Sequence, residues 1–430
     1  MTRGQRGAAE AIFGALLTIA VLLQLNAFIW IYYSANAAAY ASGPLDISPL
    51  ARAYSNARNA IEAALLLYVL LAKSAWRLLS LAGPMIALCG YFLLSVTWSD
   101  FPYDSLHSFT IFALQVIVGL AVCSGVPESV ALARLKWIAA ALIVANVAFS
   151  AAFPDLAAES AQHVGVYEGA LRGIFSHKNA LGACAALSVT PIIAATIRDG
   201  RLRLTLGAAA LLALSAALVA LSRSATSVIT FGLAFVAYGV QFGAMRAQPP
   251  IGRVATLTIL AVVAALIVVS YQTVVEMFPA VLGRDATLTG RTFLWDFALK
   301  MADLRPTLGY GFDGFWQAYN GSGGGMMKTG LWQDSEAHNA FLEAYLSGGV
   351  VGLSLTVGLL LYLAVKSLAA LVRDPSSATV FFAVCATLQI LVRCLTESDF
   401  PIQAALSGTY LTVAIVILRT RPEAQAPRPR

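Results

Sequence analysis

The residues best suited to do chemistry lie in short polar segments between long apolar runs. Histidine is the usual general base near neutral pH. The chain contains four: His107, His163, His177 and His338. His338 follows Asp334 and Glu336, acids that can orient an imidazole, and Glu343 lies just beyond it. An isolated histidine is more often a structural residue, but these neighbours lead us to expect a catalytic role for His338.

Residues 172–182 form a second polar segment, placed just before an apolar run. Its side chains at 176–179 form a run of four hydrogen-bonding groups that includes Lys178, and Arg172 lies shortly before them. One interpretation is a cationic mouth for an anionic group. The other is an ordinary helix start, with a snorkelling lysine and a Ser or Asn cap. The sequence favours neither.

Arginines mark two further segments. Arg223 lies between Ser222 and Ser224, with almost no loop separating two apolar runs. A charge so close to hydrocarbon is costly unless it snorkels or faces a polar cavity, so we favour a functional role. Arg393 and Glu397 have i, i+4 spacing, which predicts a simple ion pair or a polar wall of the same cavity.

The segment 276–338 is the longest between apolar runs. It contains Arg291 within Thr289–Thr292, followed by Trp295, and a glycine-rich stretch over 321–325 that we expect to be a flexible lid or connector. Its tryptophans suit sugar faces, but for any one of them the membrane interface is the safer assignment.

Composition decides the class of protein that must position these residues. Of 430 residues, 59% are hydrophobic and 12% are charged, and the mean hydropathy is +0.76. Soluble domains have roughly 25% charged residues, so this chain cannot cover a globular surface with polar groups. Disorder and a small disulfide scaffold are excluded as well. We expect an all-α integral membrane protein.

Apolar runs predict about twelve transmembrane helices, because a span needs roughly 20 residues. They lie near 11–32, 59–72, 78–97, 106–123, 134–153, 179–197, 204–221, 225–243, 254–275, 348–365, 378–394 and 401–418. Ala35–Ala37 resembles a signal-peptidase site, but the preceding run is long, so we interpret it as a retained span. The chain then divides into a bundle over 1–275, a long loop over 276–338, and further spans with a short tail over 339–430.

The distribution of cations predicts the orientation. Seventeen of the 28 Lys and Arg residues flank the spans on one side, which the positive-inside rule assigns to the cytoplasm together with both termini. The long loop then faces the periplasm. Arg172, Lys178, Arg223, Arg291 and Arg393 lie on the side that the rule depletes of cations, so each of them needs an explanation.

Several other classes of site are not expected. The net charge of +6 is scattered, with no basic face for nucleic acid. The five cysteines form no ligand pattern, and no cluster of Asp, Glu or His has metal-ligand spacing. No P-loop occurs. We therefore expect no metal site, no cofactor and no use of ATP.

Arginines outside the cytoplasm suggest a ligand. Bidentate guanidinium groups suit phosphate and diphosphate, and a diphosphate at this surface would be lipid-linked. Arginine can stabilise a departing diphosphate while a histidine takes the proton from an attacking sugar hydroxyl. The residues thus point to a glycosyl transfer from a lipid diphosphate sugar that needs no metal.

These motifs together resemble the O-antigen ligase and Wzy-type polymerase superfamily. The resemblance rests on residues 173–182, 222–224, 289–292 with Trp295, and 337–343 followed by Gly348 and Gly349, in that order along the chain. Residues 173–182 are most similar to the exopolysaccharide-polymerase branch, the type that makes succinoglycan-like polymers.

The resemblance implies a GT-C-like inverting glycosyltransferase that uses an undecaprenyl-diphosphate-linked oligosaccharide. By family analogy, His338 acts on the acceptor hydroxyl, and Arg223 and Arg291 bind the donor diphosphate. Arg172, Lys178, Arg393 and Glu397 are further expected binding residues. The implied location is the bacterial inner membrane, with the active site facing the periplasm.

Alternatives differ in acceptor or in class. A polymerase would extend a lipid-linked glycan, whereas an O-antigen ligase would use the lipid A core. A flippase for lipid-linked sugars should place polar groups in both halves of the membrane, and here they gather on one side. A scaffold would leave the arginines and His338 unexplained. A flippase and a chain-length regulator are further expected partners.

Overall fold

The chain is almost entirely helical in its computed structural model, which describes residues 3–25, 48–159, 169–262, 291–316, 336–402 and 406–420. The first half contains α1 (Arg3–Gln24), α4 (Ser48–Leu71), α5 (Ala75–Leu81), α6 (Gly83–Ser95), α7 (Pro102–Cys123), α8 (Glu128–Ala152), α9 (Pro154–Ala157) and α10 (Lys178–Thr196). The second half contains α11 (Leu206–Leu221), α12 (Ala225–Tyr238), a π-helical extension over Gly239–Met245, α15 (Arg291–Ala302), α17 (Ala340–Arg373), α18 (Ala378–Thr396) and α19 (Ser407–Thr420). Strands β1 (Ile197–Arg198) and β2 (Arg201–Leu202) form a short hairpin.

Helix lengths support a membrane protein with several spans. Among the described residues, six helices are long and apolar enough to cross a bilayer, in α7, α8, α10, α12 with its extension, α17 and α18. A seventh span arises if α4 and α5, bent by 107°, are taken together. Five shorter apolar helices accompany them, so each predicted run coincides with a helix, in whole or in part. The count of twelve spans and the three-part division of the chain stay predictions.

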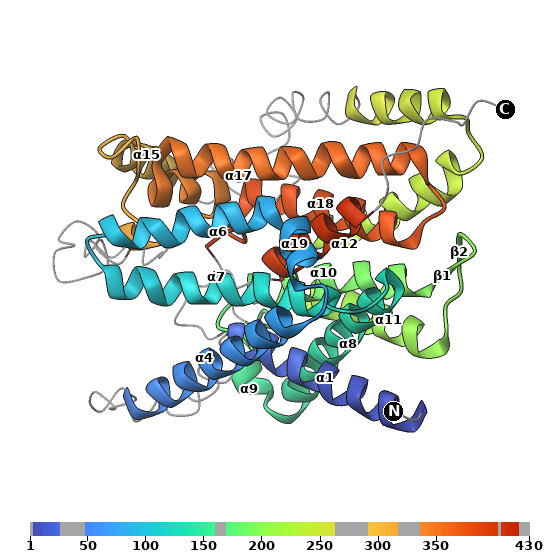
Figure 1. The fold of residues 1–430 in the computed structure, drawn as a ribbon, viewed down its shortest axis with the longest axis horizontal. Helices are drawn as coiled ribbons and strands as arrows, with labels where there is room; N and C mark the ends of the chain where they lie inside the picture. The colour runs from blue at the N-terminus through green and yellow to red at the C-terminus, as the bar shows by residue number, and fades with distance from the viewer. Residues whose placement is uncertain are drawn as a thin grey trace.

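Helix ends gather at two faces of the bundle. At one face, the Thr226 hydroxyl at the start of α12 lies 3.1 Å from the Thr396 hydroxyl at the end of α18. At the other face, Nε2 of Gln241, in the extension of α12, donates to the carbonyl of Ser377 just before α18 at 3.0 Å. We call the first the His338 face, and the second, where Glu128 begins α8, the Glu128 face. In Figure 1, α15 lies at the left end of the molecule and the β1–β2 hairpin at the right.

The α17 helix is two helical segments separated by a break. Gly349 has φ 59° and ψ −161°, a conformation closed to residues with a side chain. Residues 306–310 fill the break. The amide of Val350 donates to the carbonyl of Pro306 at 2.7 Å, and the amide of Tyr310 donates to the carbonyl of Leu346 at 2.8 Å. The described part of the long loop is therefore packed against α17.

A central helix holds the remaining elements together. Nearly all of α10 is buried, against α8, α11, α12 and α18. Gly182 permits the close approach to α12, since a Cβ there would overlap the side chain of Ser227. Gln389 of α18 accepts a hydrogen bond from the Thr190 hydroxyl at 2.6 Å, so the buried polar groups of this contact satisfy each other. The start of α10 is thereby fixed relative to the end of α18.

Candidate active site

His338 lies between two carboxylates, just before the first residue of α17. Its Nδ1 is 3.1 Å from Oε1 of Glu336 and 3.4 Å from Oε2 of Glu397. All three side chains are partly or fully buried. Burial raises the pKa of Glu336 to about 7, against the opposing effect of His338. With its Nδ1 side facing acids, the imidazole presents Nε2 as the ring nitrogen that could take a substrate proton.

Glu343 holds the backbone next to His338. Its buried carboxylate accepts hydrogen bonds from Nε1 of Trp316 at 2.9 Å and from the amide of Ala337 at 2.5 Å. The hydroxyl of Ser398 donates to it at 3.5 Å. His338 itself has φ 49°, in the left-handed region that residues with a side chain seldom occupy. The carboxylate of Glu343 therefore fixes a strained turn that presents the histidine.

Two further contacts close this turn. Asn339 caps α17, since its Oδ1 accepts from the amides of Phe341 and Leu342 at 3.0 and 3.2 Å. Trp295 of α15 donates from Nε1 to the carbonyl of Ala337 at 2.9 Å. The predicted aromatic residue of the long loop thus contacts the chain directly before the histidine, rather than a membrane surface alone.

The 172–182 segment is shaped by a glycine and a buried amide. Gly173 has φ 60°, and a Cβ at this position would overlap Oδ1 of Asn146. That oxygen accepts a hydrogen bond from the amide of Ile174 at 3.1 Å. His177 then caps α10, its Nδ1 accepting from the amide of Asn179 at 3.2 Å. The segment is a helix start, but its cap is His177 rather than Ser or Asn, and Lys178 is buried rather than snorkelling. Its role as a cationic mouth stays a prediction.

Asn179 connects this segment to the carboxylates. Its Nδ2 donates to Oε1 of Glu397 at 3.4 Å, while Oε2 of Glu397 faces His338. Three segments far apart in the sequence, namely 172–182, 336–343 and 393–399, therefore meet at one place.

The predicted binding cations differ in accessibility. Arg223 is exposed and has φ 51°, and its carbonyl accepts a hydrogen bond from Nζ of Lys178 at 3.3 Å. Lys178 and Arg172 are buried, and Nη1 of Arg172 lies 3.7 Å from Oε2 of Glu159. Oε1 of Glu159 accepts the amide of Lys178 at 2.9 Å, a favourable place for an acid at a helix start. Arg223 is the member of this group best placed to meet a ligand.

Arg393 does not pair with Glu397 in the manner that their spacing predicts. The α18 helix ends at Thr396, and Glu397 has an extended backbone, so the i, i+4 geometry is absent. Nε of Arg393 instead bonds Oδ2 of Asp399, and its Nη1 donates to the hydroxyl of Ser227 at 3.4 Å. Arg393 is 1% exposed. Its expected contact with substrate stays a prediction that would require this pair to open.

Some expected residues lie partly or wholly outside the described part of the chain. Arg291 begins α15, but its side chain is not described. Thr289, Gly290 and the glycine-rich stretch over 321–325 lie outside the described residues, as does His163. His107 is described and exposed, in α7.

Sequence reasoning missed three acids, Glu159, Glu397 as the partner of His338, and Asp399. Pattern rules report neighbours along one helix, whereas Glu159 and Glu397 meet their partners from other segments and Asp399 reaches Arg393 from beyond the end of α18. No metal cluster was expected, yet the fold brings ligand atoms of Glu336, His338 and Glu397 within 4.8 Å of one another.

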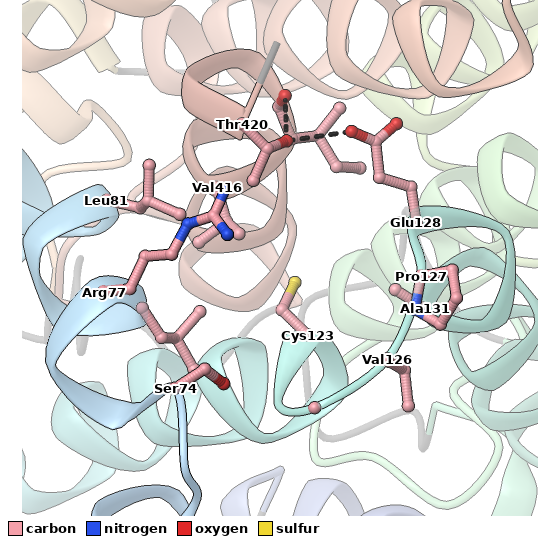
Figure 2. A pocket seen from close by; sticks show the side chains of 13 residues that line it. Ser74, Arg77, Leu81, Cys123, Val126, Pro127, Glu128, Ala131, Val416 and Thr420 are labelled. Carbon is pink, nitrogen blue, oxygen red and sulfur yellow. Dashed lines mark hydrogen bonds between the residues drawn. The ribbon is translucent and has the colours of Figure 1, made fainter.

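A separate pocket of about 370 Å³ lies on the Glu128 face. It is lined by α5, the α7–α8 turn and α19, and Figure 2 shows Arg77, Cys123, Glu128 and Thr420 around it. None of the expected site residues lines it. Most of its lining is apolar, and the Thr420 hydroxyl donates to Oε1 of Glu128 at 2.8 Å.

Comparisons with known proteins match the part of the chain that contains several of these residues. A family model described as O-Antigen ligase matches residues 208–357, a segment that includes Arg223, Arg291 and His338. The "Exopolysaccharide production protein ExoQ" of Rhizobium meliloti (strain 1021) is 30% identical over 240 residues, which are 53% of this chain and 53% of the relative. The chain thus matches about half the length of that curated relative. Over these matched segments the chain is similar to the O-antigen ligase family and to an exopolysaccharide production protein.

Proposed function

We propose that this protein is a membrane glycosyltransferase of polysaccharide synthesis. It transfers an oligosaccharide from undecaprenyl diphosphate to a sugar hydroxyl and polymerises the repeat units of an exopolysaccharide or an O-antigen. The observation that carries the proposal is the position of His338, set between Glu336 and Glu397. The same Glu397 is bonded by Asn179, and the exposed Arg223 is linked to this segment through Lys178.

The proposed reaction is a direct displacement with inversion. Nε2 of His338 takes the proton of the acceptor hydroxyl as its oxygen attacks the anomeric carbon of the donor. The bond from that carbon to the diphosphate breaks, and the lipid diphosphate leaves with the bonding electrons. Glu336 and Glu397 stabilise the imidazolium that forms, as acids behind a catalytic histidine do.

Cations are proposed to bind the leaving group. Arg223 is exposed beside Lys178, and Arg291 begins the helix that contacts the backbone next to His338 through Trp295. Guanidinium groups neutralise the negative charge that develops on the departing diphosphate, a task that requires neither a metal nor ATP. The proposed site faces the periplasm of a bacterial inner membrane, with both termini in the cytoplasm.

An O-antigen ligase is the second candidate, favoured by the description of the family model that matches residues 208–357. The two functions share the donor and differ in the acceptor. A polymerase extends a lipid-linked glycan, and a ligase makes one addition to the lipid A core.

A reconstituted assay tests both. The full chain in vesicles receives lipid-linked repeat units without ATP, and the products are separated by size. A ladder supports the polymerase, and a single addition to lipid A core supports the ligase. His338→Ala should lower the rate by roughly 10²- to 10⁴-fold, the usual contribution of a general base. His107→Ala, at an exposed histidine of α7, is the matched control. An unchanged rate in His338→Ala would contradict the catalytic assignment.

A further inference from the structure

The three side chains at the candidate site have the spacing of metal ligands. Zinc binds histidine nitrogens and carboxylate oxygens at about 2.0–2.2 Å, so two ligand atoms of a tetrahedral site lie roughly 3.4 Å apart. Nδ1 of His338 is 3.1 Å from Oε1 of Glu336 and 3.4 Å from Oε2 of Glu397. All three ligand atoms fall within 4.8 Å of one another.

The charges around this cluster also favour a cation. When both acids are ionised and the imidazole is neutral, the cluster as a whole has a charge of −2. Like charges this close repel each other. Arg393 is engaged by Asp399 and Ser227. Oε2 of Glu336 is buried and has no hydrogen-bond partner among the described residues. A divalent ion would balance the two acids and supply the missing contact.

We propose that Glu336, His338 and Glu397 bind a divalent transition-metal ion such as Zn²⁺, which inhibits the enzyme reversibly. The metal takes the lone pair of Nδ1, and the imidazole proton then resides on Nε2. An Nε2 that carries a proton cannot accept one from the acceptor hydroxyl. The ion thus turns off the general base without displacing it. The inhibition rests on the proposed function, whereas the binding of the ion does not.

The donor set selects among metals. One nitrogen and two carboxylates suit Zn²⁺, which accepts three protein ligands and one water. Mg²⁺ demands octahedral oxygen ligands and keeps its waters, so it is the matched control ion.

Binding is measured first and without substrate. The full chain in detergent is titrated with ZnCl₂ by isothermal calorimetry. We expect one saturable site per chain, weakened about tenfold or more in Glu336→Gln and in Glu397→Gln. Asp296→Asn is the control, because this exposed acid of α15 forms a local i, i+4 ion pair with Lys300. Both ligand variants are measured, so that the test still holds if one of them fails to fold. The proposal is overturned by a wild type that shows no saturable site, or by variants that bind Zn²⁺ as tightly as it does.

Inhibition is measured in the reconstituted assay. Zn²⁺ should reduce product formation by the wild type, EDTA should restore it, and the same concentration of Mg²⁺ should change nothing. Tight binding with an unchanged rate would overturn the inhibitory role. An absence of glycosyl transfer in metal-free vesicles, with Zn²⁺ binding intact, would instead contradict the proposed function and leave the metal site standing.

Discussion

The two faces of the bundle use their cations in different ways. On the Glu128 face, Arg134, Arg253 and Arg419 donate to carbonyl oxygens at helix C-terminal ends, those of Ala121, Val122, Val372 and Leu81. These are the unpaired carbonyls that every helix leaves at its C-terminus, where a positive charge is also favoured by the helix dipole. Such cations complete secondary structure.

On the His338 face, two buried arginines pair with acidic side chains. Arg172 lies beside Glu159, and Arg393 is bonded to Asp399, with all four side chains buried or nearly so. A buried pair stabilises a fold little compared with apolar residues of the same volume, because both charges lose their water. These buried pairs on the His338 face therefore contribute less to fold stability than their number suggests, whereas the cations of the Glu128 face complete helix ends.

The largest expected effect comes from breaking the buried pair. Asp399→Ala leaves the Arg393 guanidinium without its carboxylate partner, and we expect a loss of about 3–5 kcal/mol in the free energy of unfolding. Chemical denaturation of the chain in detergent measures this loss. Arg419→Ala, which removes one exposed bond to the carbonyl of Leu81, should cost about 1 kcal/mol or less.

A double variant separates structure from substrate binding at this pair. Arg393→Met with Asp399→Leu removes both charges and should recover most of the stability. If the folded double variant still makes polymer at the normal rate, Arg393 serves the fold and its predicted contact with substrate is wrong.

A second prediction compares two exposed cations of opposite faces. Arg223→Ala should reduce kcat/KM for the lipid-linked donor by about 10²-fold, the usual effect of removing one group that stabilises a leaving anion. Arg419→Ala should leave kcat/KM unchanged. The reconstituted assay measures both at equal protein.

Arg223→Lys refines this comparison. A lysine retains the charge without the bidentate fork, so partial recovery of kcat/KM is expected. Equal losses in Arg223→Ala and Arg419→Ala would show that the contrast between the faces has no bearing on catalysis.

The smallest effect concerns an acid of the His338 face for which no ion pair with a described cation is found. Burial raises the pKa of Asp313 to about 6, although the Ser108 hydroxyl donates to it at 2.6 Å. The folded chain therefore favours the protonated form. Its contribution to stability is complete below the ordinary pKa near 4 and is lost as the pH rises through 6.

Asp313→Asn should remove that pH dependence. The variant should be more stable than the wild type above about pH 6, by an amount on the order of 1–2 kcal/mol, and should lose this advantage near pH 4. Thermal unfolding at both pH values checks the sign. A constant difference between variant and wild type would contradict the assignment.

Individual residues show how much of the structure could be predicted from the sequence. The polar segments around His338, Lys178 and Arg223 were found because charge and hydrogen-bonding groups are rare among apolar runs, and the fold brings them together. Helix identity was accessible for the same reason, since hydropathy depends on local composition.

What the sequence did not reveal depends on where helices end. The pairing of Arg393 with Glu397 was expected for a continuous helix, but α18 stops at Thr396, where Glu397 faces His338 and Asp399 bonds the arginine. The residue at which α18 ends therefore decides which acid pairs with Arg393. Hydropathy sets helix ends only within a few residues, so such side-chain pairing needs the tertiary structure.

The left-handed backbone of His338 has a consequence for evolution and engineering of the chain. Glycine is the residue best suited to φ 49°, and asparagine is tolerated there better than an imidazole. His338→Gly should therefore relax the backbone of the turn, a gain that offsets part of the cost of losing the contacts with Glu336 and Glu397. A search for thermostable variants would thus exert only weak pressure to keep this histidine, whereas selection on product formation would retain it.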